Sequence, residues 1–206
     1  MNLPNKLTLS RIIIIPVIIL VSLIPFFNNT VLFGDLSRGT EITLENIVLL
    51  VIFVLASFTD FLDGYIARKR NIITNFGKFM DPLADKLLVF ATIIVLLERG
   101  RFSAFGFGLG FVVTLMIARE FIVTGIRLLA VNENVVIAAS KLGKAKTVSQ
   151  MIMIIVLLVN CYPFALLGES AKDITALILI AIAGLLTLIS GFDYFIKNKT
   201  LIFEKK

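Results

Sequence analysis

Four aspartates lie close together in a region with strongly apolar flanks: Asp60, Asp63, Asp81 and Asp85. An acidic side chain at mid-bilayer costs about 2.5–3.5 kcal/mol on insertion scales, so an intramembrane carboxylate indicates a functional site. At helical spacing, Asp60 and Asp63 share one face of a helix, and Asp81 and Asp85 share one face of the next. The spacing predicts two carboxylate-bearing faces that form one acidic pocket.

Oxygen ligands in this arrangement favour divalent metal ions. Carboxylates packed together repel one another unless a positive charge lies among them, and oxygen-only ligands suit hard cations such as Mg²⁺ or Mn²⁺. Two such ions about 3.5–4 Å apart can bind a transferring phosphoryl group, so the aspartates predict phosphoryl transfer. Alternatively, the acids pair with neighbouring cations in a charged girdle at the membrane surface, namely Arg68, Lys69, Arg70, Lys78 and Lys86.

Small residues lie among the acids along the same stripes. Gly64 and Ala67 follow Asp63, and Gly77 precedes Asp81. Their lack of side-chain bulk lets a ligand or a neighbouring helix approach the backbone. Close packing of helices in lipid uses the same residue types, so both interpretations stay open at this point.

Missing residue types exclude several other kinds of catalysis. The chain has no histidine, which excludes Ser-His-Asp triads and His-ligated zinc sites. Cys161 is the only cysteine, so neither an intrachain disulfide nor a thiolate cluster can form.

The elements that position the acids are predicted to cross a membrane. Of the 206 residues 58% are hydrophobic, against roughly 45–50% in soluble domains, and they are grouped in long blocks. A transmembrane helix needs about 20 apolar residues, and about six such segments can be placed. The predicted spans are Leu7–Phe27, Leu44–Ile66, Gly77–Leu97, Ser103–Ala130, Thr147–Leu167 and Ile174–Ile196. We expect residues 1–206 to form a single membrane domain.

The distribution of Lys and Arg predicts the orientation of these spans, because short cytoplasmic loops accumulate both residue types. With the N-terminus inside, only Arg38, Arg99, Arg101 and Lys172 of the 20 basic residues fall on the outer side. Both termini and the acidic pocket are therefore expected on the cytoplasmic side of a multi-pass protein of the cell membrane. The net charge of +6 is interpreted as this topology signal and as affinity for anionic lipids, not as nucleic-acid binding.

A polar stripe precedes the first span. Asn5, Thr8 and Arg11 recur at helical spacing and predict a short N-terminal interfacial helix that lies over the site. The same residues could equally serve as a helix cap and a headgroup anchor.

The acids and small residues together resemble the signature of the CDP-alcohol phosphatidyltransferase family. The pattern in this chain matches that signature without a departure: Asp60-x2-Asp63-Gly64-x2-Ala67-Arg68-x8-Gly77-x3-Asp81-x3-Asp85. The resemblance implies the family's fold, an all-α integral membrane bundle of six transmembrane helices, and a homodimer. It also implies a reaction in which the phosphatidyl group of CDP-diacylglycerol is transferred to an alcohol.

The resemblance further implies a role for each residue of the signature. Asp60, Asp63 and Asp81 would ligate two divalent cations, Mg²⁺ or Mn²⁺. Asp85 would also approach the metals and would accept the proton of the incoming hydroxyl, because a carboxylate beside two dications stays ionised. Arg68 would stabilise the pyrophosphate, and the CDP-lipid as a whole would contact Asp60, Gly64, Ala67, Arg68 and Gly77.

Further segments resemble one branch of the family, the phosphatidylglycerophosphate synthases: NLPNKLTLSRI, DPLADK, REFIVTGIR and GKAKT. That branch uses sn-glycerol 3-phosphate as acceptor and forms phosphatidylglycerophosphate and CMP in phospholipid biosynthesis. A phosphorylated acceptor needs a cationic pocket, for which Arg119, Lys141, Lys144 and Lys146 are the candidates. As alternatives, Arg119 could pair with Glu120, and the lysines could be ordinary positive-inside residues.

Two other functions remain as alternatives. The same chemistry could serve another acceptor, such as inositol phosphate, serine or phosphatidylglycerol. A non-catalytic cation transporter could use the four acids as a binding site. However, no pair of broken half-helices is evident, and transport does not require the pattern of Gly64, Ala67 and Gly77.

Overall fold

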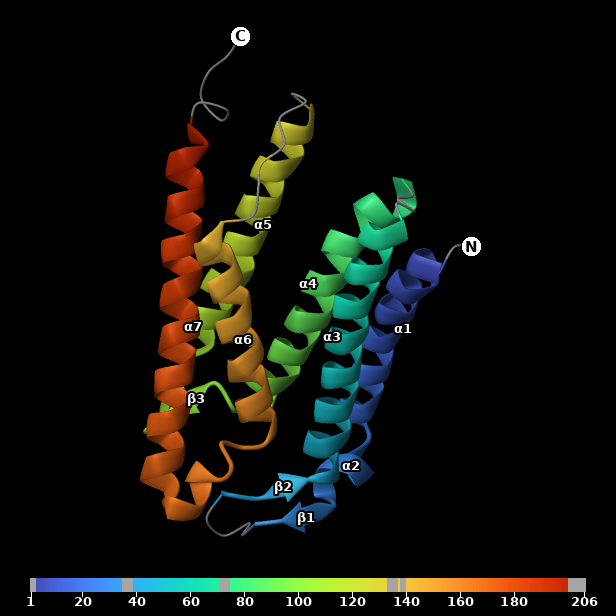
Figure 1. The fold of residues 1–206 in the computed structure, drawn as a ribbon. Helices are drawn as coiled ribbons and strands as arrows, with labels where there is room; N and C mark the ends of the chain where they lie inside the picture. Colours follow the sequence, from blue (N-terminus) through green and yellow to red (C-terminus); the bar gives the residue numbers. More distant parts are fainter. Residues whose placement is uncertain (1–2, 35–38, 71–74, 133–136, 138–139, 200–206) are drawn as a thin grey trace. The chain divides into compact units, whose positions relative to one another are not determined.

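The computed structural model describes residues 3–34, 39–70, 75–132, 137 and 140–199, without the side chains of 3–8, 11, 60–70, 75–83, 85 and 131–132. Helices form most of this part of the chain (Figure 1). The elements are α1 (Leu3–Leu23), α2 (Pro25–Asn29), β1 (Val31–Phe33), β2 (Ile42–Thr43), α3 (Leu44–Arg70), α4 (Asn75–Glu98), β3 (Ser103–Ala104), β4 (Phe107–Gly108), α5 (Gly110–Asn132), α6 (Lys141–Leu158), the 3-10 helix η2 (Phe164–Leu167) and α7 (Glu169–Lys197).

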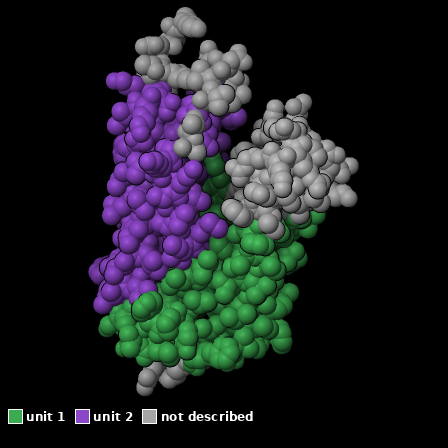
Figure 2. All heavy atoms as spheres, in the orientation of Figure 1, with its two compact units in different colours: residues 1–101, 155–172 green, residues 102–154, 173–206 purple. Residues whose placement is uncertain are grey.

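The chain divides into two compact units, shown in different colours in Figure 2. Unit 1 contains residues 1–101 and 155–172, and unit 2 contains residues 102–154 and 173–206. Each unit is described separately below. A single catalytic domain for the whole chain stays a prediction.

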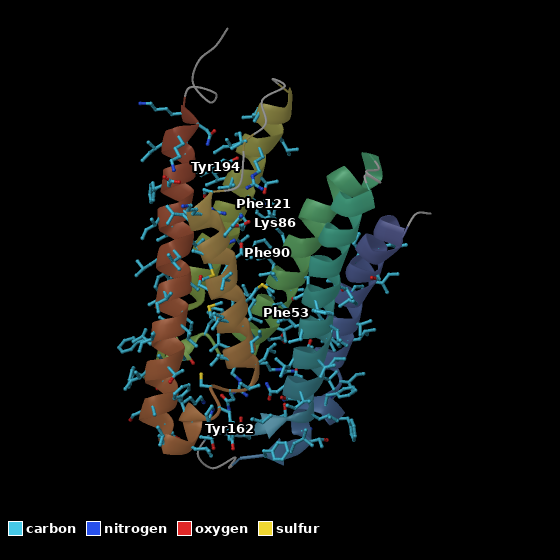
Figure 3. The ribbon with its side chains drawn as sticks, in the orientation of Figure 1. Phe53, Lys86, Phe90, Phe121, Tyr162 and Tyr194 are labelled. Carbon is cyan, nitrogen blue, oxygen red and sulfur yellow. The ribbon has the colours of Figure 1, made fainter. Side chains whose placement is uncertain are left out.

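In unit 1, α1, α3 and α4 pack against one another (Figure 1). Their contact is apolar: Ile18 of α1, Phe53 of α3 and Ile93 of α4 are fully buried. Figure 3 shows Phe53 on α3. Between helices in lipid, association depends on close van der Waals packing, to which these three buried side chains contribute.

A polar network joins residues 155–172 to the first hundred residues. Asn160 is 1% exposed, and its Nδ2 donates hydrogen bonds to the carbonyl oxygens of Gly39 (3.0 Å) and Glu41 (2.9 Å). The guanidinium of Arg101 donates to Oδ1 of Asn160, and Nζ of Lys172 donates to the same Gly39 oxygen at 2.7 Å. Burial lowers the pKa of Arg101, and the nearby Glu41 carboxylate opposes that shift. These contacts explain why the segment belongs to unit 1.

In unit 2, α5, most of α6 and α7 lie together (Figure 1). The buried stripe of α7 recurs every three to four residues: Ala176, Ile180, Ala183, Thr187, Ser190 and Tyr194. Tyr194 points from α7 toward α5 (Figure 3), where it packs with Val123 and Ile126 and lies 5.6 Å below the Arg127 guanidinium. The contact of α5 with α7 therefore includes one aromatic ring near the end of α7.

The predicted spans correspond only in part to the helices. Each of the predicted segments overlaps one long helix, but within the described residues only α7 is long and apolar enough by itself to cross a membrane. Two shorter apolar stretches, Ile12–Leu23 and Leu44–Thr59, occur in α1 and α3. The number of transmembrane helices therefore stays a prediction, whereas a mostly helical fold is confirmed.

Several helix ends differ from the prediction, and two of them have a local explanation. The first helix stops at Leu23, because Ile24 takes an extended conformation before Pro25. The fourth begins at Gly110 instead of Ser103, because β3 and β4 form a hairpin whose turn has left-handed Phe105 and Gly106. The fifth ends at Leu158 and not at Leu167.

Two further expectations need correction. The N-terminal interfacial helix is not a separate element, since α1 continues from Leu3 to Leu23 and neither proline nor glycine occurs between Asn5 and Ile15 to interrupt it. The fold is also not purely α, because the described residues include two short antiparallel pairs, β1–β2 and β3–β4.

Candidate functional site

The candidate metal ligands lie where α3 ends and α4 begins. Asp60 and Asp63 belong to about the last three turns of α3, and Asp81 and Asp85 belong to about the first three turns of α4. Both helix ends lie at the same end of unit 1 (Figure 1). The backbone thus brings the two acidic segments to one end of this unit.

The acids of α3 are in register with its buried face. Leu49, Phe53 and Ala56 are each at most 2% exposed and recur at intervals of three to four residues. Continued at the same period along the helical backbone, this stripe reaches Asp60 and Asp63.

The acids of α4 show the same relation. Ala84 is fully buried, and Leu88 and Thr92 are at most 3% exposed. Asp85 precedes Leu88 by three residues, and Asp81 precedes Asp85 by four. All four aspartates therefore occupy helix positions that continue core-facing stripes, which favours an interior pocket over a charged girdle.

The structure does not describe the side chains that would form this pocket. They belong to the predicted metal ligands and nucleotide-binding residues, namely Asp60, Asp63, Gly64, Ala67, Arg68, Gly77, Asp81 and Asp85. Their roles stay predictions, as does the choice between nucleotide contact and helix packing for the small residues. Among the described residues, no group of three or more Asp, Glu, Cys or His side chains could hold a metal ion.

The candidate acceptor-binding residues in unit 2 form a buried ionic network. Glu120 Oε1 accepts hydrogen bonds from Arg119 Nη1 and Lys146 Nζ, both at 2.5 Å. Arg119 Nη2 donates a further hydrogen bond to Ser190 Oγ at 2.9 Å. The side chains of Arg119, Glu120 and Lys146 are 11%, 8% and 7% exposed. The pairing of Arg119 with Glu120 that the sequence left as an alternative is therefore present, and Lys146 shares it.

Two cations, Arg119 and Lys146, share the Glu120 carboxylate in this network. Guanidinium and ammonium groups are the side chains that commonly bind phosphate. Arg119 Nε is also buried, and no hydrogen-bond partner reaches it in the part of the chain that the structure describes. Arg119 can therefore pair with Glu120 and still offer a donor to an anion.

Lys141 and Lys144 differ from Lys146 in their exposure. Both side chains are exposed in the first turn of α6, which begins after Ser140. Ser140 Oγ accepts a hydrogen bond from the Gly143 backbone N–H at 3.0 Å and thus caps the helix. The exposure of the two lysines fits either positive-inside residues or flexible ligands for an anion near the helix N-terminus.

Sequence reasoning missed two neighbours of Arg119. Ser190, whose hydroxyl accepts the Arg119 hydrogen bond, is 71 residues away. A Cβ added to the adjacent Gly191 would lie 2.8 Å from Arg119 Cγ, so the arginine stem lies directly against this glycine. The only signal in the sequence is the Ser190–Gly191 pair in a mostly apolar part of α7.

Comparison with known proteins is consistent with the signature. Residues 1–189 match the model of the CDP-alcohol phosphatidyltransferase family. A Bacillus subtilis (strain 168) protein is 42% identical over 96% of this chain and 95% of its own length. Proteins of Rickettsia felis and Haemophilus influenzae are 40% and 32% identical over 94% of this chain, and over 93% and 91% of their own lengths. All three are named CDP-diacylglycerol–glycerol-3-phosphate 3-phosphatidyltransferase.

The family match covers most of the chain, and it includes the whole acidic segment from Asp60 to Asp85. The relatives are similar over nearly their entire lengths, so the similarity is not confined to the signature. Sequence pattern, helix register and comparison therefore agree. The chain belongs to the CDP-alcohol phosphatidyltransferase family.

Proposed function

We propose that this membrane protein transfers the phosphatidyl group of CDP-diacylglycerol to sn-glycerol 3-phosphate, forming phosphatidylglycerophosphate and CMP in phospholipid biosynthesis. The observation that carries the proposal is the register of the four signature aspartates with the buried stripes of α3 and α4. The names of the relatives support the donor and the acceptor.

The carboxylates fit divalent metal ions, which members of this family use. Asp60, Asp63, Asp81 and Asp85 offer oxygen ligands only, the donor type that Mg²⁺ and Mn²⁺ prefer. We propose that they hold two such ions. Bound there, the cations would neutralise the negative charge of the donor's diphosphate.

Asp85 acts as the general base. It accepts the proton of the acceptor hydroxyl while the hydroxyl oxygen forms a bond to the phosphorus that bears diacylglycerol. The bond from that phosphorus to the bridging oxygen breaks, and CMP leaves with the electron pair. Asp60, Gly64, Ala67 and Gly77 contact the CDP part of the donor, and Arg68 binds its diphosphate.

The network of Arg119, Glu120 and Lys146 binds the phosphate of the acceptor. Its two cations, its burial and the unused Arg119 Nε support this role. Lys141 and Lys144 are assigned a weaker, longer-range attraction for the same phosphate, because both are exposed.

The protein is further proposed to be a multi-pass homodimer of the cell membrane, with six transmembrane helices and with both termini and the active site on the cytoplasmic side. The charge distribution supports this orientation. Exposed apolar side chains support contact with lipid, for example Leu185, Ile189, Phe192 and Ile196 on one side of α7.

The test of the proposed function is CMP release by purified protein in detergent with CDP-diacylglycerol and Mg²⁺. We expect release that depends on glycerol 3-phosphate, and little with inositol phosphate, serine, phosphatidylglycerol or no acceptor. CMP release with another acceptor would be consistent with the metal mechanism but would assign the protein to another branch of the family. No release with any of these acceptors would favour the cation transporter.

Arg119→Ala is expected to raise the KM for glycerol 3-phosphate by roughly 10- to 100-fold, the effect of losing a charge-assisted hydrogen bond. The KM for CDP-diacylglycerol should change little. Arg127→Ala is the matched control, because Arg127 also lies on α5 but contacts the Tyr194 ring. Steady-state kinetics with varied glycerol 3-phosphate test this prediction. An unchanged KM for glycerol 3-phosphate would show that Arg119 does not bind the acceptor.

A further inference from the structure

We infer that Ser190 and Gly191 of α7, together with Glu120, are positioning residues that orient Arg119 for the acceptor's phosphate. The inference rests on the proposed function, because it assumes that Arg119 binds that phosphate. It adds α7 to the acceptor site, although this helix carries none of the residues that the sequence predicted to be part of the site.

Gly191 sets the path of the arginine side chain. An added Cβ would lie 2.8 Å from Arg119 Cγ, 3.8 Å from Cδ and 3.5 Å from Nε. Cγ is close to the backbone of α5, so it can move away only if the whole side chain takes another path. Because Gly191 has no side chain, there is space at this position for the aliphatic part of Arg119 and next to its Nε atom. Any larger residue at position 191 would displace Arg119.

Two hydrogen bonds fix the plane of the guanidinium. Nη1 donates to Glu120 Oε1 at 2.5 Å, and Nη2 donates to Ser190 Oγ at 2.9 Å. The Ser190 hydroxyl itself donates to the Thr187 carbonyl oxygen at 3.0 Å, so its lone pairs face the arginine. A guanidinium has five N–H donors, and Nε–H is left without a partner among the described residues. The arrangement holds the arginine rigid, and these two bonds leave Nε–H and the second hydrogens of Nη1 and Nη2 for a ligand.

Gly184 provides a matched control for Gly191. It lies seven residues earlier on α7, and a Cβ there would also meet α5 at 2.8 Å, but at Val112 Cγ1. Gly184→Ala and Gly191→Ala therefore disturb the same helix pair to a similar extent, and only the second reaches Arg119. A general packing effect should affect both variants alike.

The experiment compares the KM for glycerol 3-phosphate among these variants, with CMP release as the readout. Gly191→Ala is expected to raise this KM by at least about 10-fold, approaching Arg119→Ala, and to leave the KM for CDP-diacylglycerol within about twofold. Gly184→Ala should leave both constants within about twofold, whatever its effect on thermal stability. Equal changes in the two glycine variants, or a change in neither, overturn the inference.

A second pair of variants keeps the inference testable if Gly191→Ala does not fold. Ser190→Ala removes the hydroxyl that accepts from Nη2 and should raise the acceptor KM by about 3- to 10-fold, whereas Ser190→Thr retains a hydroxyl and should restore it. A Ser190→Ala enzyme with the wild-type acceptor KM contradicts the inference.

A double substitution distinguishes action through Arg119 from independent effects. Once Arg119 is alanine, Cγ is absent and Gly191→Ala has nothing to displace, so it should add no further increase in the acceptor KM. Additive increases would overturn the positioning role. If the wild-type protein uses glycerol 3-phosphate and all these variants have its acceptor KM, the inference is refuted but the proposed function is not. Wild-type protein that uses only unphosphorylated acceptors refutes the proposed function and the inference with it.

Discussion

Asp85→Asn is expected to abolish turnover, lowering kcat for CMP release by about 10²- to 10⁴-fold, the contribution of a general base. Asparagine has almost the size of aspartate but cannot take up the proton of the acceptor hydroxyl. Residue 85 lies well inside α4, three positions before the buried Leu88. Because the helix and its core are unaffected, CDP-diacylglycerol binding should be retained.

The measurement pairs kcat with equilibrium binding of CDP-diacylglycerol to the same purified variant. Glu98→Gln is the matched control, because it removes an exposed carboxylate from the opposite end of α4 and should leave turnover unchanged. Full activity in Asp85→Asn would show that the base assignment is wrong. Loss of donor binding together with turnover would indicate that Asp85 serves mainly as a metal ligand.

The long helices were predictable because bilayer-length apolar blocks favour helices wherever they occur. Their ends were not, because short turns depend on single residues. Residues 103–108 fell within the predicted span Ser103–Ala130, yet the left-handed conformations of Phe105 and Gly106 allow a hairpin there. Hydropathy measures transfer to lipid and is insensitive to backbone conformation.

The placement of the acidic residues on two consecutive helices was predictable from spacing, whereas the pocket itself stays a prediction. Asp60, Asp63, Asp81 and Asp85 lie close in sequence on consecutive helices, so helical periodicity is enough to place them on shared faces. The register with Phe53 and its neighbours could be recognised only once burial was known.

The ionic network of unit 2 shows what sequence reasoning cannot reach. Arg119 and Glu120 are adjacent, so their pairing could be foreseen. Lys146 is 26 residues from Glu120 and Ser190 is 71 residues from Arg119, so these contacts depend on how three helices pack. Gly191 has no side chain with which to signal its role, and only the close approach of Arg119 reveals it.

Asp60→Asn is expected to weaken metal binding as well as catalysis, in contrast to Asp85→Asn. Residue 60 follows the buried Ala56 by one helical turn and is proposed to serve both the metals and the donor nucleotide. An amide oxygen has no net charge, so it attracts a divalent cation less strongly than a carboxylate does. Loss of an outer-shell partner alone typically costs 10- to 100-fold in metal affinity, so a direct ligand should raise the half-saturating Mg²⁺ concentration by at least about 10-fold.

Titration of CMP release with Mg²⁺, after removal of bound metal by a chelator, tests this expectation. Turnover by Asp60→Asn should recover partly as Mg²⁺ is raised, because the remaining carboxylates still bind the ion at higher concentration, whereas Asp85→Asn should not recover. Asp173→Asn is the matched control, since its side-chain oxygen can still accept the Phe105 N–H bond of 2.7 Å and lies outside the proposed site. If Asp60→Asn needs no more Mg²⁺ than the wild type, Asp60 is not a ligand. If added Mg²⁺ restores turnover by Asp85→Asn, Asp85 serves mainly as a metal ligand, because additional cation cannot replace a missing proton acceptor.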